Sequence, residues 1–523
     1  MAHRFPQHVI LASYVLCGTA VVSPLLWVSI PALVDYASYL ARAAILLAPG
    51  ASENYVVHWQ VIPNLAFDLI APPIARLVGI ETAGRLFIGA TMLLPVAAAA
   101  LLHRALFGRV GLWPLAAFLF VYNYALYFSF LNYLFGLGVA LACFAGWIAT
   151  ATWRLAPRIA LFALAGVVIY LCHLFAFGLY GLLIGSYETG LLRAGRPLSA
   201  SMLRRYALVF LQFLPAVALW LANHQAGEPH TIDYGTVQDK ISAVLAPMNF
   251  HSFGWFLAPV VAALAYLAWR TGSLVLAPSM RWPLLATMAC AVAMPATLYG
   301  SWAADLRLPV ALPFLLVGSL RPARAQPWLA RAAIVSAGGF LGTTIVATTL
   351  VWQAMDRNYA EFREVSRALP RGVRLMVARN HIPDDWGPIG QVPTALATLD
   401  YRSFYHVSNF AIMDRDAFIS SFGLQLAPVE PAARNRSLQS QSHTPLFVET
   451  LIESAGKADA EMPVDETGLH HDTADWPHKF DYLLFIDYGD PRNPLPALLQ
   501  PIARGSYFTY YRIAAGRDGP GIE

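Results

Sequence analysis

Charged side chains are scarce in this sequence. Asp, Glu, Lys and Arg together make up 13% of its 523 residues, whereas hydrophobic residues make up 57%. An ordinary globular protein has a charged fraction of about 25%, so this chain has too few charges to cover a water-soluble surface. The composition excludes an ordinary soluble protein and indicates an integral membrane protein.

Cysteines are also few, and the polar C-terminal third has none. The four cysteines lie in apolar runs: Cys17, Cys143, Cys172 and Cys290. Because a disulfide-stabilised domain would need pairs of cysteines in its polar part, no disulfide framework is expected. The net charge is only +4, and the basic residues are spread over short loops. A binding surface for DNA or RNA is therefore not expected either.

Three common catalytic motifs are missing. The sequence contains no phosphate-binding glycine loop after a strand, no HExxH and no GxSxG. These motifs build a phosphate cradle, a zinc site and a serine nucleophile, respectively. Nucleotide hydrolysis, zinc proteolysis and serine hydrolysis therefore have no support in the sequence.

Long uncharged runs dominate the chain instead. The first, Val9 to Leu33, holds 25 residues, and a helix needs roughly 20 residues to cross a bilayer. Such runs predict an all-α polytopic membrane bundle with about 11 transmembrane helices. The expected spans lie near residues 9–33, 86–102, 111–128, 130–153, 159–172, 173–190, 206–222, 252–269, 283–300, 308–320 and 332–353. If the pair between residues 159 and 190 forms a re-entrant hairpin, two spans are lost and every loop keeps its side.

The basic residues of the short loops fall on one side of this scheme. They are Arg4, Arg104, Arg109, Arg154, Arg158, Arg193, Arg196, Arg204, Arg205, Arg270, Arg281, Arg321 and Arg324. Because basic residues of short loops collect on the cytoplasmic side, the N-terminus is expected in the cytoplasm and the chain after residue 353 outside it. In a bacterial cell this describes a multi-pass protein of the inner (plasma) membrane with a periplasmic C-terminal part.

The C-terminal part, Asp356 to Glu523, is long enough to form a domain. Its strand-like segments VRLMVAR (373–379), YLLFIDY (482–488) and SYFTYYRI (506–513) alternate with helix-like ones and predict a small α/β unit. Residues 427–478 are rich in Pro, Ser, Asn and His and predict irregular loop. The expected domains are a transmembrane domain, residues 1–355, and a periplasmic α/β domain, residues 356–523.

The first outer loop, residues 35–85, is the most informative part of the membrane domain. Its charged residues alternate with stretches such as YLARAAILLA and NLAFDLIAPPIARLVG, which have the pattern of short amphipathic helices in the membrane interface. A loop of this size can roof a cavity. Charged groups near hydrocarbon are costly unless they are solvated or paired, so those that face a water-filled cavity usually have a task.

The layout of the chain resembles a known family. An aspartate directly after the first span, a long first outer loop, about eleven spans and an outer C-terminal domain are together similar to the GT-C class of polytopic membrane glycosyltransferases, in particular its bacterial RgtA/B/C/D-like branch. The matching segments are DYASYLAR (35–42), FSFLNYLFGLGVAL (128–141), CHLFAFGLYGLL (172–183) and ADLRLPVALPFLLVG (304–318). The resemblance implies an enzyme that uses a polyprenyl-phosphate sugar and a lipid or glycan acceptor. Some members of the class use a divalent cation, and the sequence leaves Mg²⁺ or Mn²⁺ open.

By this resemblance Asp35 is the catalytic carboxylate. The chemistry agrees, because an acceptor hydroxyl that attacks an anomeric carbon must lose a proton, and a fixed carboxylate beside a low-dielectric wall can take it. The alternative is that Asp35 caps an interfacial helix that begins near Tyr36, as aspartates do at many helix starts.

A lipid-phosphate donor also needs a cation for its phosphate, and the planar fork of arginine binds phosphate oxygens in pairs. Arg307 is the leading candidate, because it follows Asp305 at the outer start of the tenth span. The alternative is a local ion pair, or a side chain that reaches to the interface. Arg42 in the first outer loop is a second candidate for substrate binding.

Two histidines complete the candidates for substrate binding. His173 interrupts an uncharged run, where a histidine is costly without a partner, so it is expected to face the interior of the bundle. A simple hydrogen bond is the alternative to a substrate contact. His58 lies beside Trp59 in the first outer loop, where both could bind a sugar of the donor or the acceptor.

The predicted function is transfer of one sugar, with inversion, from a polyprenyl-phosphate carrier to a lipid or polysaccharide acceptor at the outer face of the inner membrane. The main alternative is a transporter or flippase for a lipid-linked glycan, which carries out no bond chemistry. Transporters usually have ionisable residues in mid-span and matched broken helices, whereas the charges here lie at span ends. A third alternative is a scaffold that presents the outer domain to protein partners.

Overall fold

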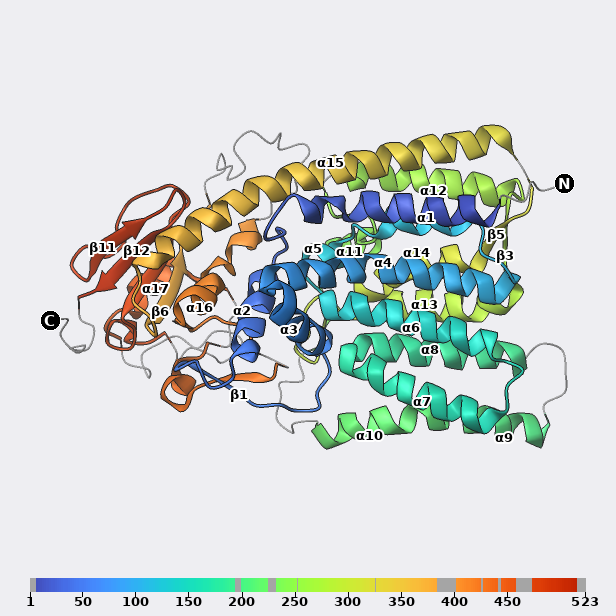
Figure 1. The fold of residues 1–523 in the computed structure, drawn as a ribbon, viewed down its shortest axis with the longest axis horizontal. Coiled ribbons are helices and arrows are strands. Elements are labelled where there is room, and N and C mark those ends of the chain that lie inside the picture. The colour runs from blue at the N-terminus through green and yellow to red at the C-terminus, as the bar shows by residue number, and fades with distance from the viewer. Residues whose placement is uncertain are drawn as a thin grey trace.

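The computed structural model describes residues 6–192, 199–223, 232–251, 253–324, 326–382, 401–424, 427–440, 444–457 and 473–514. A long helical bundle carries a smaller domain at one end, and the N-terminus lies at the other end (Figure 1). The helix α15 (Pro327–Val365) runs along the bundle and continues into this domain. The expected domain boundary at residue 355 therefore falls inside one helix.

Seven helical segments in the described part of the chain are long and apolar enough to cross a membrane. They are α1 with the short 3-10 helix that follows it (Gln7–Leu26), α4 (Ile80–Phe107), α6 (Leu131–Ala149), α7 (Leu155–Cys172), α8 (Leu174–Leu192), the segment from α9 to α10 (Ala200–Asn223) and α15. Each of them coincides with one expected span. The chain is thus a multi-pass membrane protein.

The other four expected spans contain shorter helices. They are the 3-10 helix η2 (Trp113–Phe120), α12 (Gly254–Arg270), α13 (Arg281–Ala293) and α14 (Arg307–Ser319). Proline accounts for one of these lengths, because α13 ends shortly before Pro295. The residue before a proline is pushed toward extended backbone, and Met294 is extended.

The helices of the first outer loop, α2 (Tyr36–Leu47) and α3 (Ala66–Val78), lie between the bundle and the C-terminal domain (Figure 1). Nearly all of α2 is buried, including its polar residues Ser38 and Arg42. The prediction of a helix lying in the membrane interface is wrong for α2, because the C-terminal domain covers the face that would otherwise meet water or lipid headgroups. Gly84 of α4 permits the close approach of α2: a Cβ atom there would lie 2.1 Å from the Tyr36 hydroxyl.

The C-terminal domain contains a mixed sheet, which confirms the predicted small α/β unit. Its strands follow the order β11 (Leu499–Arg504), β12 (Thr509–Ile513), β10 (Tyr482–Ile486), β6 (Arg374–Arg379) and β7 (Phe418–Ile419), and β9 (Leu446–Phe447) also pairs with β6. β10 and β6 are parallel, with Tyr482 opposite Leu375. The region expected to be irregular, 427–478, contributes β9, β8 (Val429–Pro431) and the helix α17 (Val448–Ser454). That expectation was wrong because these elements are held by tertiary pairing.

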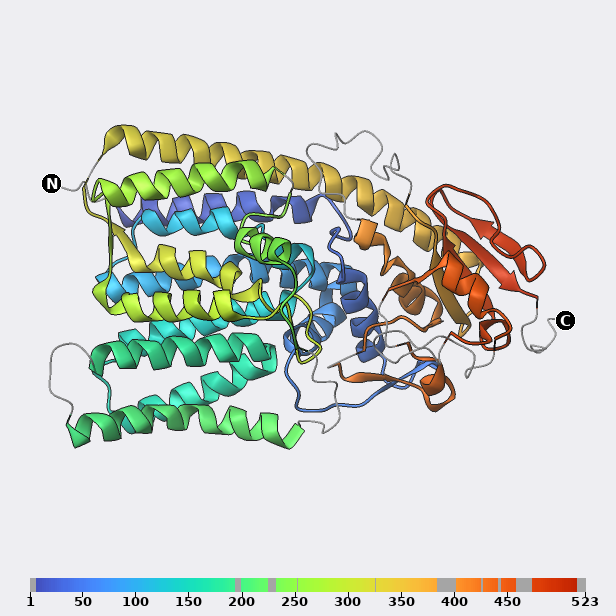
Figure 2. The same ribbon diagram turned by 180° about the vertical axis from the view of Figure 1, so that it is seen from behind.

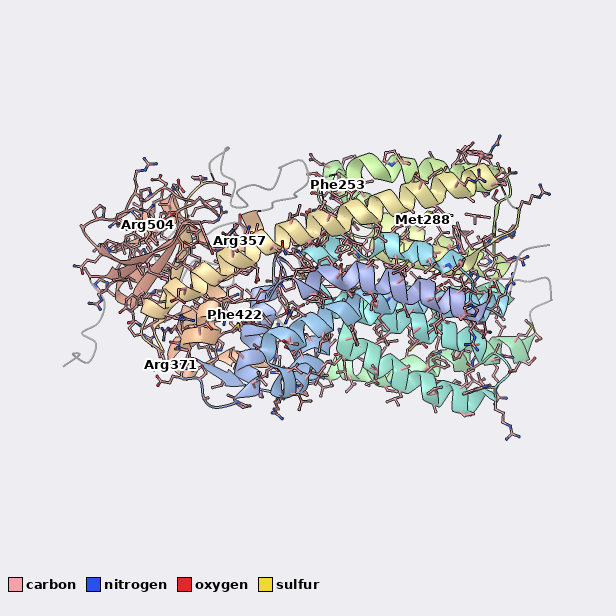
Figure 3. The ribbon with its side chains drawn as sticks, turned by 45° about the horizontal axis from the view of Figure 1, so that its top comes forward. Phe253, Met288, Arg357, Arg371, Phe422 and Arg504 are labelled. Atoms are coloured by element: carbon pink, nitrogen blue, oxygen red, sulfur yellow. The ribbon has the colours of Figure 1, made fainter. Side chains whose placement is uncertain are left out.

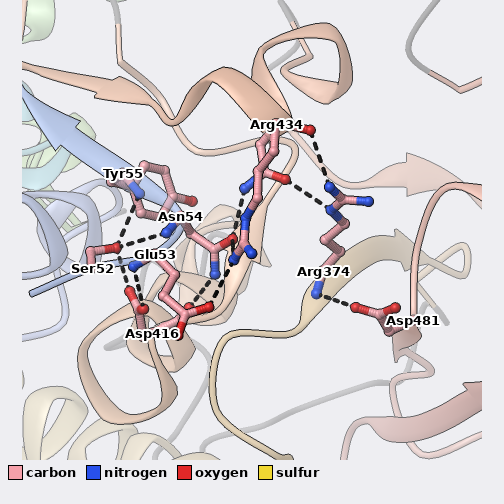
Figure 4. A network of polar contacts seen from close by, with 9 residues as sticks. Ser52, Glu53, Asn54, Tyr55, Arg374, Asp416, Arg434 and Asp481 are labelled. Carbon is pink, nitrogen blue, oxygen red and sulfur yellow. Dashed lines mark hydrogen bonds and ion pairs between the residues drawn. The ribbon is translucent and has the colours of Figure 1, made fainter. Parts of the chain in front are cut away.

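The first outer loop is joined to the C-terminal domain by backbone and side-chain contacts. Its strand β1 (Tyr55–Val57) pairs antiparallel with β8. A polar network continues this junction (Figure 4): Ser52 donates to Asp416 at 2.5 Å, and Arg434 contacts both Glu53 and Asn54. Phe422 lies behind the junction, with its ring 5.5 Å from that of Tyr55 (Figure 3). Loop and domain therefore form one continuous structure above the bundle.

Two further contacts fasten the C-terminal domain to the membrane helices. Arg363 of α15 binds Glu81 of α4 at 2.5 Å and Asp414 of α16 (Phe410–Arg415) at 2.8 Å. Asp356 of α15 accepts the backbone N–H groups of Ser29 and Ile30. Figure 2 shows that α11 (Val237–Leu245), which belongs to the second outer loop, lies toward the end of the bundle that faces the domain. This end of the bundle is where the candidate site residues gather.

Candidate functional site

Asp35 stands where the chain leaves the bundle and enters α2. It occupies the N-cap position of this helix, but its carboxylate makes no capping hydrogen bond to the backbone. Instead it accepts a hydrogen bond from the Ser38 hydroxyl at 3.1 Å. The backbone N–H of Asp35 donates to the Ser129 hydroxyl at 3.0 Å, which fixes the residue against the segment before α6. The carboxylate of Asp35 therefore does not cap α2, which was the alternative role expected for this residue.

The C-terminal domain supplies a partner for this carboxylate. Nε2 of His406 lies 3.3 Å from Oδ1 of Asp35. The side chain of His406 is only 11% exposed, whereas that of Asp35 is 45% exposed. Asn409 supports the arrangement by donating to the Ser38 hydroxyl at 2.9 Å. One edge of the carboxylate is thus held by protein groups, and the rest is open.

His406 was missed by sequence reasoning. It lies in the C-terminal domain, far from Asp35 along the chain, and no spacing links the two positions. The only signal was composition: the segment YHVSNF (405–410) holds a histidine and an asparagine among apolar residues that form a buried turn. Only the docking of this turn on α2 brings the histidine to the aspartate.

Arg307 is buried at the first turn of α14, with 5% of its surface exposed. Its guanidinium carbon lies 4.4 Å from the ring centre of Phe175 and 4.9 Å from that of Phe130. One terminal nitrogen donates to the carbonyl of Trp302 at 3.2 Å, and Nε has no hydrogen-bond partner among the described residues. A buried guanidinium with a free N–H and no hydrogen-bonded carboxylate is poised to bind an anion.

Asp305 is not the ion-pair partner of Arg307. Its carboxylate binds Lys240 of α11 at 2.9 Å, and Lys240 also donates to the carbonyl of Met294 at 2.6 Å. The pair ties the second outer loop to the start of α14. Asp305 therefore positions the segment before Arg307 instead of neutralising it.

His173 belongs to the surroundings of Arg307. It breaks the helix between α7 and α8 with extended backbone, and its Nδ1 accepts the N–H of Phe175 at 3.1 Å. Its ring lies 5.6 Å from that of Tyr133, whose hydroxyl donates to the carbonyl of Arg307. The hydrogen bond predicted as an alternative to substrate contact is present, and the histidine helps to place Phe175 under the guanidinium.

Asp35 and Arg307 both contact the turn before α6, residues 127–130. The backbone of this turn binds the start of α2, because Val34 donates to the carbonyl of Tyr127 at 2.9 Å and Asp35 donates to Ser129. The next residue, Phe130, contacts the guanidinium of Arg307. The predicted base and the predicted phosphate ligand are thus joined through one short turn.

Arg42 forms a buried ion pair with Asp68. Its Nε lies 2.6 Å from Oδ1 of Asp68, and both side chains are almost fully buried. Burial raises the pKa of the Asp68 carboxyl, and the neighbouring Arg42 opposes this shift. One guanidinium nitrogen and Oδ2 of Asp68 have no hydrogen-bond partner in the described part of the chain. Arg42 therefore holds α2 to α3, and its charge is already compensated.

Tyr39 lies between these charged groups. Burial raises the pKa of its hydroxyl, and the charges of Arg42, Asp35 and Asp68 also act on it. It interacts electrostatically with Arg307 as well. Its ring packs edge-on against Phe67 of α3 at 5.1 Å and under the Arg42 guanidinium at 4.8 Å. Tyr39 thus forms the inner wall of the region that contains Asp35 and Arg307.

His58 lies apart from the other candidates. Its ring nitrogen Nδ1 is 3.0 Å from Oε1 of Glu430, and its backbone N–H donates to Pro428. These contacts extend the pairing of β1 with β8. The structure therefore places His58 at the junction of loop and domain, and not beside Asp35.

The described residues do not form a cluster with the donor set for a divalent cation. No group of three His, Cys, Asp or Glu side chains converges in this part of the chain. Asp35 has one histidine beside it and no second carboxylate in contact. A cation that needs several carboxylate oxygens does not fit this arrangement.

Two cavities in the described part of the chain are large enough for small ligands. One, of about 240 Å³, lies in the C-terminal domain and is lined by Asn380, Val448, Phe485, Asp490, Arg492 and Pro494. The other, of about 340 Å³, lies along α15 and is lined by Gly342, Thr343, Val346 and Ala347. Neither is lined by the residues that surround Asp35 or Arg307.

Comparisons with known proteins give a likeness to two solved structures. No known protein family matches the chain, and no curated protein matches its sequence. ArnT from Cupriavidus metallidurans, bound to undecaprenyl phosphate, aligns with a TM-score of 0.47 and 14% identity over 96% of this chain and 97% of its own. The arabinofuranosyltransferase AftD from Mycobacteria aligns with a TM-score of 0.46 and 14% identity over 96% of this chain and 40% of its own. At these values the likeness assigns no activity.

Proposed function

We propose that the protein is a membrane glycosyltransferase that moves one sugar from a polyprenyl-phosphate donor to a lipid or glycan acceptor. The donor class follows from the sequence resemblance given above. The reaction is proposed to occur at the outer face of the inner membrane, since the arginine-rich loops favour a cytoplasmic N-terminus. The site of reaction is the region between Asp35 and Arg307.

The observation that carries this proposal is the state of the Asp35 carboxylate. It stands at a helix start without capping the helix, is held on one edge by Ser38 and His406, and is 45% exposed. A carboxylate with a purely structural role would accept hydrogen bonds from backbone N–H groups or form an ion pair with a lysine or arginine. A general base needs the opposite: a fixed position and a free oxygen that reaches the proton it removes.

The proposed chemistry is a direct displacement with inversion. An acceptor hydroxyl gives its proton to Asp35 while its oxygen forms a bond to the anomeric carbon. The bond between that carbon and the phosphate oxygen breaks, and the electron pair leaves with the polyprenyl phosphate. Arg307 binds the phosphate, where negative charge increases as the bond breaks, so it stabilises the transition state more than the ground state. Tyr39 and Phe130 exclude water from the inner side.

The experiment is a transfer assay with the full-length protein in lipid vesicles and a panel of radiolabelled polyprenyl-phosphate sugars. Asp35→Asn is expected to lower the turnover by about a hundredfold or more, the usual effect of losing a general base. The matched control is Asp233→Asn, which changes an exposed aspartate of the second outer loop and is expected to keep full activity.

Two results would contradict the proposal. Full activity of Asp35→Asn would remove this residue from the mechanism. Movement of the intact lipid-linked sugar across the vesicle membrane, with no cleavage of the sugar–phosphate bond by the unsubstituted protein, would favour the transporter. Folding of each variant is checked by its elution as a single species in detergent.

A further inference from the structure

A second buried arginine lies in the C-terminal domain, outside the region described above. Arg379 is the last residue of β6 and is 7% exposed. Its guanidinium carbon lies 3.7 Å from the ring centre of Phe447 and 4.6 Å from that of Tyr405. Within the described residues it forms no ion pair, and its Nε has no hydrogen-bond partner. Two aromatic rings thus pack against the cation, and its Nε–H group is left without an acceptor in this part of the chain.

The histidine next to this cluster already has an acidic partner. Glu449 binds Nε2 of His381 at 2.9 Å. The ring of His381 also stacks on that of Phe447, with the ring centres 5.1 Å apart. His381, Phe447, Arg379 and Tyr405 thus form one stack of side chains. The side chain of Phe447 is 40% exposed, so the stack reaches the surface.

An unpaired buried cation is expensive for a folded protein. Removing a guanidinium from water without a counterion carries a large desolvation penalty, which contact with two aromatic rings offsets only in part. A methionine or leucine would fill the same space without this cost. Retention of the charge is explained if an anion completes the site.

The position in the sheet also favours a binding site. β6 and β10 are parallel neighbours, so their carboxyl ends meet at one edge. The chain continues from β6 to β7 on one side, and β10 lies on the other side, which makes this edge a topological switch point. In open α/β sheets, ligands bind outside the carboxyl ends of the strands at such points. The cavity lined by Asn380, Asp490 and Arg492 lies at the same edge.

The stack is linked to the proposed catalytic region by adjacent residues. Tyr405 contacts Arg379, and the next residue, His406, contacts Asp35. The stack and the proposed catalytic region are therefore joined by one short segment, residues 405–406. The donor phosphate already has Arg307 as its candidate ligand, so a second cation joined to this region has the acceptor as its natural partner.

We infer that Arg379 binds a carboxylate or phosphate group of an anionic saccharide acceptor. The identification of this ligand as the acceptor rests on the proposed function. The binding itself does not depend on transfer, because Asp35 takes no part in it. The planar fork of Arg379 donates to two oxygens of the anion, and the exposed ring of Phe447 lies against the sugar.

The test is a calorimetric titration of the full-length protein in lipid nanodiscs with three probes. These are glucuronate, glucose 6-phosphate and neutral glucose. Both anionic sugars, or one of them, are expected to bind more tightly than glucose, and the comparison shows whether a carboxylate or a phosphate is preferred. Arg379→Gln is expected to weaken anion binding about tenfold, the effect of losing a charged hydrogen bond. The matched control is Arg371→Gln, an exposed arginine of the same domain, which is expected to bind normally (Figure 3).

Several outcomes decide the matter. Equal binding of glucose and both anionic sugars, absence of any binding, or equal binding by Arg379→Gln and the unsubstituted protein would overturn the inference. If Arg379→Gln does not fold, Arg379→Lys gives the answer, because it keeps the charge and loses the fork and is expected to weaken binding as well. Asp35→Asn is expected to bind the anionic sugars normally even where it abolishes transfer. Failure of the proposed function would therefore leave this result intact.

Discussion

His406 and Asp35 form a contact between the C-terminal domain and the start of α2, with Nε2 of the histidine 3.3 Å from Oδ1 of the aspartate. The histidine is nearly buried and the aspartate is nearly half exposed. A donor held by the domain thus fixes one carboxylate oxygen, which leaves the other for substrate. The C-terminal domain is therefore part of the proposed site and not an appendage to the bundle.

Loss of His406 is expected to lower turnover without changing substrate binding. His406→Ala removes the group that orients Asp35, so kcat should fall about tenfold while KM for the donor stays constant. His406→Gln can place an N–H group near the position of Nε2 and should restore part of kcat. Steady-state kinetics of both variants measure this. A rise of KM with constant kcat in either variant would show that His406 contacts substrate instead.

Substitution of Arg307 is expected to act on the donor. Arg307→Gln should weaken binding of the polyprenyl-phosphate sugar and lower its transition-state stabilisation, so kcat/KM should fall about ten- to a hundredfold. Arg307→Lys should restore only part of the activity, because an ammonium cannot form the planar fork or the ring contacts with Phe130 and Phe175. Donor titration measures both effects. Unchanged donor kinetics in Arg307→Gln would exclude a phosphate-binding role.

Breaking the Arg42 and Asp68 pair is expected to unfold the first outer loop before it affects chemistry. Asp68→Leu leaves a buried guanidinium without its counterion, which typically costs about 3 to 5 kcal/mol. The double variant Arg42→Met with Asp68→Leu removes both charges and should recover most of the lost stability. Thermal unfolding in detergent compares the unsubstituted protein, Asp68→Leu, Arg42→Met and the double variant. Additive destabilisation in the double variant would show that the two side chains act independently.

The stability of the C-terminal domain is expected to depend on the protonation of Asp487. This carboxyl is 1% exposed and accepts the hydroxyl of Thr509 at 2.7 Å and the N–H of Gly489 at 2.9 Å. Burial raises its pKa above the ordinary value of 3.8, and the hydrogen bond from Thr509 opposes this shift. The folded state therefore holds the proton more tightly than the unfolded state. The free energy of unfolding should fall as the pH rises from the unfolded to the folded pKa.

The variant Asp487→Asn cannot titrate and should lack this contribution. Its stability relative to the unsubstituted protein should rise as the pH increases through the same window. Thermal unfolding of both proteins at a series of pH values measures the difference. Thr509→Val is the control, because it loses the hydroxyl but keeps the titrating carboxyl. A stability difference between Asp487→Asn and the unsubstituted protein that stays constant with pH would contradict the prediction.

Much of the bundle could be predicted because one physical requirement governs it. A helix that crosses hydrocarbon must satisfy its own backbone and present apolar side chains for about 20 residues. Each of the seven long helices is visible in the sequence as such an apolar run. The lengths of α12, α13 and α14 were less predictable, since an apolar run shows where a helix can lie but not where its backbone hydrogen bonds stop.

The candidate site was predictable only in part. Asp35 was singled out by the family resemblance, and Arg307 by the need of a lipid-phosphate donor for a cation at the outer start of a span. The counterion of Arg42, the distance of His58 from the other candidates and the pairing of Asp305 with Lys240 were not visible. Each depends on which outer segments pack together, and no local pattern records that choice.

By itself the sequence determined that the chain crosses a membrane many times, because hydrophobic length and the lack of charge leave no other solvent for it. It also showed strand-like segments that alternate with helix-like ones in the C-terminal domain. Tertiary structure alone decided that the first outer loop is buried under that domain, with β1 paired to β8 and His406 placed on Asp35. The reason is that contacts between segments far apart in the chain depend on complementary surfaces, which exist only once both segments have folded.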